Sequence, residues 1–130
     1  MGLSDEDRKS VVDYQLEKAK RTLAEIPILL ENKFWRNATN RLYYACFYAA
    51  TALLINDGHE THTHNGVQTL LGLHFVNKGI ISAEQGRLFR TLFERRLKGD
   101  YDALDIKEED IKPLFEPAKE FIAEIENLLS

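Results

Sequence analysis

Several features that often define a protein class are scarce or missing in this chain of 130 residues. It has one cysteine, Cys46, so a disulfide within the chain cannot form. No apolar run approaches the ~18 residues that a membrane-spanning helix needs, so no transmembrane segment is expected. Residues 1–7 are acidic and polar instead of basic and then apolar, so we expect no secretory signal. These absences predict a cytoplasmic protein with no membrane partner.

The sequence also lacks the short motifs of common enzyme classes. It contains no glycine-rich phosphate loop, no Gly-x-Ser-x-Gly elbow, no His-Glu-x-x-His and no Cys-x-x-Cys. No segment alternates apolar and polar residues over the length of a strand, and no internal repeat occurs. The familiar hydrolase and redox classes therefore gain no support, no cofactor is expected, and one domain accounts for residues 1–130.

Apolar residues instead recur at helical spacing in the first half of the chain. A first helix is expected over residues 5–31, where Pro27 predicts a kink or an early end. A second helix over residues 34–57 is apolar nearly all round, which is typical of a central, buried helix. Gly58 is expected to end this helix in the left-handed conformation.

The second half predicts shorter helices with recognisable ends. The third helix should close at Gly79, and Ser82 has a suitable partner three residues later for capping a fourth. Asp105 repeats that capping pattern before the last helix, whose regular part should start late or bend because of Pro113 and Pro117. Amphipathic helices joined by short connections predict an all-α, up-and-down bundle of four to five helices.

The most informative feature is a local excess of positive charge in a chain with 17 basic and 21 acidic residues. Arg96 shares a helical stripe with two phenylalanines and Asp100, so it points where apolar residues point. A cation there needs a partner, and Asp100 is the nearest candidate unless the helix ends before Gly99. Against one acid, Glu94, the region 87–98 carries five cations: Arg87, Arg90, Arg95, Arg96 and Lys98.

Two interpretations of these cations stay open. In the first, Arg95 and Arg96 present permanently charged forks to a phosphate, with Tyr101 stacking or donating its hydroxyl. In the second, the basic helix pairs with residues 108–130, which hold seven acids against two lysines. The more exposed cations would then be simply solvated.

The second helix carries a further stripe of mixed character, Arg41, Tyr44 and Tyr48. If it faces the end of the fourth helix, one cleft would collect arginines, tyrosines and an aspartate, which suits a nucleotide or single-stranded nucleic acid. The same tyrosines equally suit a subunit interface, where rings are buried and hydroxyls stay wet. A site between two subunits would combine both roles. The candidate ligand-binding residues are Arg41, Tyr44, Tyr48, Arg95 and Arg96.

A loop with three histidines, His59, His62 and His64, invites a metal-binding interpretation. Imidazoles at this spacing can reach one zinc or nickel ion. Structural zinc sites, however, usually combine ligands from two separated segments, and this loop has no cysteine. We therefore expect no metal, with the three histidines as a weaker alternative.

Four segments, in order, resemble the HEPN-domain proteins, especially their small stand-alone bacterial and archaeal branch. The match covers roughly residues 10–128, and its segments are NRLYYACFYAATALL (40–54), HNGV (64–67), FVNKG (75–79) and RLKGDYD (96–102). The resemblance implies a helical bundle that forms homodimers, often encoded beside a small nucleotidyltransferase in toxin–antitoxin pairs.

Many HEPN proteins are metal-independent ribonucleases in which an arginine and a histidine about four to six residues later form a site across the dimer. Arg96 corresponds to that arginine, but Asp100 and Tyr101 stand in the place of the histidine. An imidazole can exchange protons near neutral pH, whereas an ionised aspartate can serve as a base but hardly as an acid.

The resemblance therefore favours a HEPN module that binds RNA, a nucleotide or a nucleotidyltransferase partner through an Arg/Tyr cleft at a homodimer interface. One alternative is a metal-independent, toxin-like ribonuclease with Arg96, Asp100 and Tyr101 as its catalytic residues. The other is a purely structural dimerisation or adaptor module whose arginines pair internally.

Overall fold

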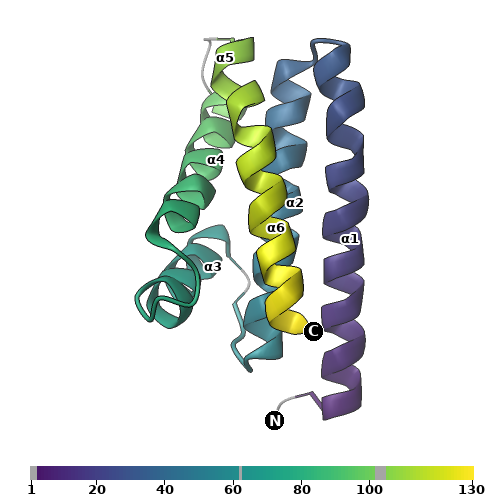
Figure 1. The fold of residues 1–130 in the computed structure, drawn as a ribbon, viewed down its shortest axis with the longest axis vertical. Coiled ribbons are helices and arrows are strands. Elements are labelled where there is room, and N and C mark those ends of the chain that lie inside the picture. The colour runs from purple at the N-terminus through teal and green to yellow at the C-terminus, as the bar shows by residue number, and fades with distance from the viewer. Residues whose placement is uncertain (1–2, 62, 102–104) are drawn as a thin grey trace.

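The computed structural model describes residues 3–61, 63–101 and 105–130. Its long helices run side by side, up one and down the next (Figure 1): α1 (Asp5–Glu31), α2 (Trp35–Asn56), α4 (Ala83–Tyr101) and α6 (Phe115–Leu129). Two short helices each continue into a turn of another helical type: α3 (His64–Leu71) into the π-helical η1 (Gly72–Val76), and α5 (Glu108–Ile111) into the 3-10 turn η2 (Lys112–Leu114). The described residues contain no strand, which confirms the predicted all-α bundle. None of the described helices is both long and apolar enough to cross a membrane.

Helix α2 lies at the centre of the bundle and contacts α1, α4 and α6. Small side chains line it, and because they add little bulk the neighbouring helices can approach closely. The fully buried alanines of α2 are Ala38, Ala45, Ala49, Ala50 and Ala52. Cys46 is also fully buried, and burial raises the pKa of its thiol, as expected of a packing residue and not of a reactive thiolate.

Helix α1 passes through its proline without ending. Pro27 lies within the helix, which continues to Glu31, so the expected early end is wrong. A proline inside a helix removes one backbone donor, and here the ring sits on the exposed side beside the fully buried Ile26. Packing of the apolar face against α2 therefore holds the last turn of α1 in place.

Among the described residues, three in the left-handed conformation end or follow helices. Gly58 (φ +84°) and Gly79 (φ +75°) confirm the predicted glycine stops. The third is Lys33 (φ +60°), between α1 and α2. The amide N–H of Phe34 donates to the carbonyl oxygen of Leu29 at 2.9 Å, which is the hydrogen bond of a Schellman turn. Lys33 thus occupies a position that glycine normally fills.

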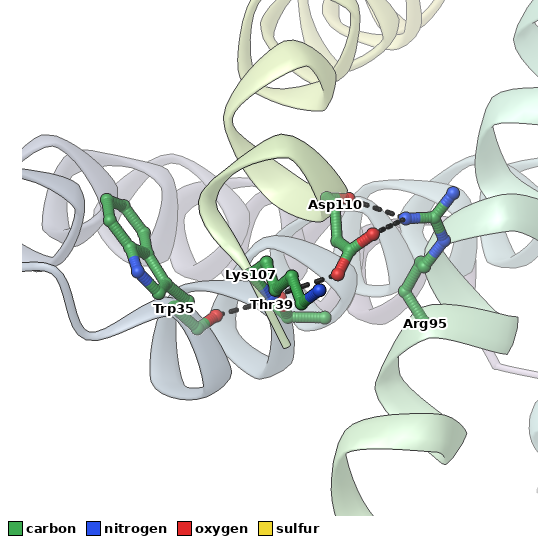
Figure 2. Close-up of polar contacts among 5 residues, drawn as sticks. All are labelled: Trp35, Thr39, Arg95, Lys107 and Asp110. Carbon is green, nitrogen blue, oxygen red and sulfur yellow. Dashed lines mark hydrogen bonds and ion pairs between the residues drawn. The ribbon is translucent and has the colours of Figure 1, made fainter. Parts of the chain in front are cut away.

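The caps of the second half are partly as predicted. The Ser82 hydroxyl accepts the N–H of Gln85 at 3.0 Å, which confirms the cap of α4. The cap predicted at Asp105 is wrong, because α5 begins after Lys107, whose N–H donates to the Asp110 carboxylate at 2.9 Å. That carboxylate also binds Arg95, which fixes the start of α5 two residues later than predicted (Figure 2). Helix α6 starts only after Pro113, as expected.

Helix α4 continues through Gly99 to Tyr101. Gly99 is buried, and a Cβ atom there would lie 3.3 Å from the side chain of Ile106. The glycine therefore permits a close approach of the chain and does not end the helix. As a result Asp100 stays one helical turn beyond Arg96, on the same face.

Replacing Lys33 by glycine should stabilise the protein. A non-glycine residue in the left-handed region is strained, and removing that strain while allowing for the extra entropy of unfolded glycine leaves a gain of about 0.5–1 kcal/mol. Urea denaturation of Lys33→Gly and Lys33→Ala separates backbone strain from loss of the charge. A glycine variant no more stable than the alanine variant would contradict this account.

Candidate functional site

The guanidinium of Arg96 is held among aromatic rings between α2 and α4. Its side chain is only 11% exposed. Its central carbon lies 5.1 Å from the ring centre of Tyr43, 5.6 Å from that of Tyr44 and 5.7 Å from that of Phe93. A cation over aromatic faces is attracted by their quadrupoles, by about 0.5–2 kcal/mol per contact depending on desolvation. The rings therefore fix the position of the charge without neutralising it.

One carboxylate of the same chain pairs with this charge. A terminal nitrogen of Arg96 donates to Oδ2 of Asp100 at 3.3 Å, and the Asp100 side chain is 30% exposed. The Nε atom of Arg96 is buried and has no hydrogen-bond partner among the described residues. Because guanidinium has five N–H donors, one long contact leaves most of its hydrogen-bonding capacity unused. The predicted Arg96–Asp100 pair is thus formed, but Arg96 is not saturated by it.

His64 joins the same cluster from the first turn of α3. Its Nδ1 atom lies 2.8 Å from the hydroxyl oxygen of Tyr43, and its ring centre lies 4.5 Å from that of Phe47. Thr63 sets the position of this residue by capping α3, since its hydroxyl accepts the N–H of Gly66 at 2.9 Å. The imidazole is therefore fixed by a cap on one side and by a tyrosine on the other.

We call this cluster the Arg96 site: Tyr43, Tyr44, His64, Phe93, Arg96 and Asp100. Burial raises the pKa of Tyr43 above its usual value, so its hydroxyl stays protonated at neutral pH. Burial also lowers the pKa of His64, and the nearby charge of Arg96 lowers it further. At neutral pH the site thus contains a neutral imidazole, a protonated phenol and a guanidinium.

Other predicted site residues lie elsewhere. Arg41 turns toward α1, where its Nε is 3.5 Å from a carboxylate oxygen of Glu25. The Nζ of Lys18 lies 4.3 Å from the ring centre of Tyr48. Tyr44 alone of the α2 stripe contacts the Arg96 guanidinium, with Tyr48 as its neighbour at 5.8 Å between ring centres. The α2 stripe therefore divides between α1 and α4, and ligand binding by Arg41 and Tyr48 stays a prediction.

Arg95 faces away from Arg96 and is bonded within the chain. One of its terminal nitrogens donates to the backbone oxygen of Asp110 at 2.9 Å and to its carboxylate at 3.2 Å. Figure 2 shows this arrangement beside the hydrogen bond from Thr39 to the backbone of Trp35. Consecutive helical residues point about 100° apart, so the two arginines serve different surroundings. Arg95 ties α5 to α4, and a ligand-binding role for it stays a prediction.

The remaining predictions concern Tyr101 and the histidine loop. Tyr101 is the last residue of α4, and its side chain lies outside the described part of the structure. His62 also lies outside the described residues. Among those described, no group of three histidine, cysteine or acidic side chains could hold a metal ion. His59 instead contacts Asp57 at 2.9 Å, and His64 belongs to the Arg96 site.

Sequence reasoning missed His64 and Tyr43 as members of this site. In the sequence, Tyr43 belongs to the nearly all-apolar second helix, and His64 stands out only as a weak candidate metal ligand. No periodicity links them, because a loop separates their helices. Within the HEPN resemblance, the only signal is that both fall in matching segments, YY (43–44) and HNGV (64–67).

The charge of Arg96 should be measurable through the titration of His64. Replacing Arg96 by glutamine removes one of the two causes that lower the pKa of His64, so that pKa should rise toward its ordinary value of 6.5. The wild-type pKa lies below the unfolded value, so protonating His64 favours unfolding. Its contribution to stability is complete above about pH 6.5 and is lost as the pH falls through the folded pKa.

NMR titration of the His64 ring checks this directly, with Arg21→Gln as a control for loss of a distant, exposed positive charge. An unchanged His64 pKa in Arg96→Gln would show that the two side chains do not interact as described.

Comparison with known proteins now places this chain in a family. The HEPN domain family model matches residues 12–128. The chain is 33% identical to the UPF0332 protein of Thermotoga maritima over 124 residues, which are 95% of this chain and 94% of that one. It is 34% identical to the protein named "Putative toxin MJ0605" of Methanocaldococcus jannaschii over 127 residues, which are 98% and 95% of the two chains. The chain therefore belongs to the HEPN domain family.

Proposed function

We propose that this HEPN protein binds single-stranded RNA, and that two copies of the chain form the binding surface. The observation that carries the proposal is the guanidinium of Arg96, held by aromatic rings and paired through one long contact with Asp100. A phosphate oxygen could accept the hydrogen bonds that the chain leaves unused. The affinity of such a site would come from charge and would weaken with salt.

The aromatic residues around Arg96 suit RNA better than a simple anion. Tyr44, Phe47 and Tyr48 form one half-buried group along α2, with neighbouring ring centres 5.8–6.2 Å apart. Unpaired bases stack on such rings, and each stack contributes about 1–3 kcal/mol. A nucleotide would use one ring at most, whereas a strand would use several.

A second copy of the chain would complete the site. Half-buried tyrosines with hydroxyls at the surface are typical of subunit interfaces. The symmetry of a dimer would bring two Arg96 residues to one surface, so that one strand could contact both. A nucleotidyltransferase partner could occupy the same surface, and the experiment below separates the two.

Binding of a 12-nucleotide oligouridine with a 5′-hydroxyl end tests the proposal. Fluorescence anisotropy should show salt-dependent binding by a complex that contains two protein chains. Arg96→Ala removes charged hydrogen bonds and should weaken RNA binding by roughly tenfold or more. A tenfold change in Kd corresponds to ~1.4 kcal/mol of binding free energy. Arg96→Lys, which keeps the charge but not the planar fork, should also weaken it.

The matched control is Arg21→Ala, which removes an exposed arginine of α1 and changes the net charge equally. It should leave RNA affinity within about twofold. Equal affinity for RNA in wild type and Arg96→Ala, or a wild-type protein that binds a nucleotidyltransferase and no RNA, would contradict the proposal.

Cleavage of the bound RNA is a second candidate function, and the position of His64 favours it. Asp100 takes the place of the family's usual histidine, but His64 brings an imidazole into the same aromatic cluster from α3. If Nδ1–H donates to the Tyr43 oxygen, Nε2 can accept the proton of a ribose 2′-hydroxyl. The 2′-oxygen would then attack phosphorus and the 5′-oxygen would leave, taking a proton from water. The relative from Methanocaldococcus jannaschii is named "Putative toxin MJ0605", and ribonuclease activity is one way in which a toxin can act.

This candidate predicts cleavage in the presence of EDTA, with 2′,3′-cyclic phosphate and 5′-hydroxyl ends as products. His64→Gln should abolish cleavage with little change in RNA affinity. The rate should fall on the acidic side as His64 becomes protonated, with a midpoint below pH 6.5 because burial lowers its pKa. If Asp100 were the base instead of His64, Asp100→Asn would abolish cleavage. Full activity of His64→Gln would remove His64 from the reaction.

A further inference from the structure

A hollow of about 370 Å³ lies between η1 and the N-terminal half of α4, away from the Arg96 site. Arg87 and Arg90 line it from α4, and Gln68 and Asn77 line it from the other side. Arg96 instead faces Tyr43 and Tyr44 of α2. The hollow is large enough for a small ligand.

The charged side chains that line this hollow are both positive. Arg87 and Arg90 are exposed, and neither forms an ion pair with any residue in the described ranges. No aspartate or glutamate of the described residues lines the hollow. It also reaches the first turn of α4, the positively polarised end of a helix of 19 residues. Glu84, the acid of that first turn, is not among the residues that line the hollow.

An unused hydrogen-bond donor lies in the wall of the hollow. The side-chain nitrogen of Gln68 is buried and has no partner among the described residues. A buried donor without an acceptor is costly, and proteins seldom keep one without a reason. Gln68 lines the hollow, and a turn of its side chain would bring this nitrogen to a ligand oxygen.

The backbone shapes the hollow, because η1 changes its helical type there and packs closely against α4 beside it. The π-helical turn of η1 widens the chain opposite α4, and such turns are frequent at functional sites. On the other side Gly86 has no side chain, and a Cβ atom there would lie 3.1 Å from Val76. A residue larger than glycine would therefore press against the wall formed by Val76.

We propose that this hollow binds a phosphomonoester. Arg87 and Arg90 lie three positions apart on α4, so their forks can approach a single phosphate group from one helix face. The amides of Gln68 and Asn77 would donate to its remaining oxygens. A free mononucleotide and the 5′-phosphate end of an RNA strand share this chemistry. The proposal does not depend on RNA binding at the Arg96 site.

Isothermal titration with inorganic phosphate, uridine and uridine 5′-monophosphate tests the assignment. Uridine monophosphate should bind at least about tenfold more tightly than uridine, and inorganic phosphate should compete with it. Arg87→Gln/Arg90→Gln should weaken monophosphate binding by about tenfold or more. Its matched control is Arg21→Gln/Lys98→Gln, which removes two exposed positive charges outside the hollow and should leave binding unchanged.

Gln68→Met supplies a variant that should remain folded. Methionine is close to glutamine in size and removes the unpartnered donor, so the melting temperature should stay equal or rise while monophosphate affinity falls several-fold. A lower melting temperature with unchanged affinity would remove Gln68 from the site.

Oligouridine with and without a 5′-phosphate separates the two sources of the ligand. Tighter binding of the phosphorylated strand, lost in Arg87→Gln/Arg90→Gln but not in the control, assigns the hollow to strand ends. Monophosphate binding without that gain assigns it to a free nucleotide. Equal affinity for uridine and its monophosphate, or unchanged monophosphate affinity in the double variant, would overturn the proposal. The 5′-hydroxyl strand reports on the Arg96 site independently.

Discussion

The permanent charge of Arg96, placed among aromatic rings between α2 and α4, is the constraint on which the candidate site depends. Guanidinium cannot escape burial by losing a proton, so the surroundings must supply compensation. Three aromatic faces and one carboxylate do so in part. Burial lowers the pKa of His64 and the charge of Arg96 lowers it further, whereas the same charge opposes the rise in the pKa of Tyr43 that burial causes. Burial therefore sets the direction of both pKa shifts, and the charge of Arg96 modifies each of them.

Much of this could be predicted from helical periodicity. The spacing of Phe93, Arg96 and Asp100 correctly placed the arginine on an apolar face with the aspartate beside it. What periodicity left open was whether α4 would end at Gly99, because glycine most often stops a helix. Here Gly99 allows the side chain of Ile106 to pack closely against α4, a contact that the local sequence pattern does not predict. The position of Asp100, one helical turn beyond Arg96, thus depends on tertiary packing.

The contacts that sequence reasoning left undecided share a cause. Arg95 and Arg96 are neighbours in sequence, yet a helix turns them to different partners, Asp110 and Tyr43. His64 reaches the site from 21 positions beyond Tyr43, across a loop whose path is set by a threonine cap. The sequence left open whether the stripe with Arg41 faces α4, and Arg41 contacts Glu25 of α1. Periodicity predicts which face a residue occupies, and only the packing of helices decides what that face meets.

The charge balance of the chain limits how it could bind RNA. A net charge of −4 repels a polyanion at long range, and charges further apart than about 8 Å are screened at physiological salt. Attraction must therefore come from cations concentrated where the strand touches. Arg95 is occupied by Asp110, so each protomer offers Arg96 at one surface and the Arg87–Arg90 pair at another. In the proposed dimer each contact would occur twice, so that a strand meets several cations at once although the protein as a whole is acidic.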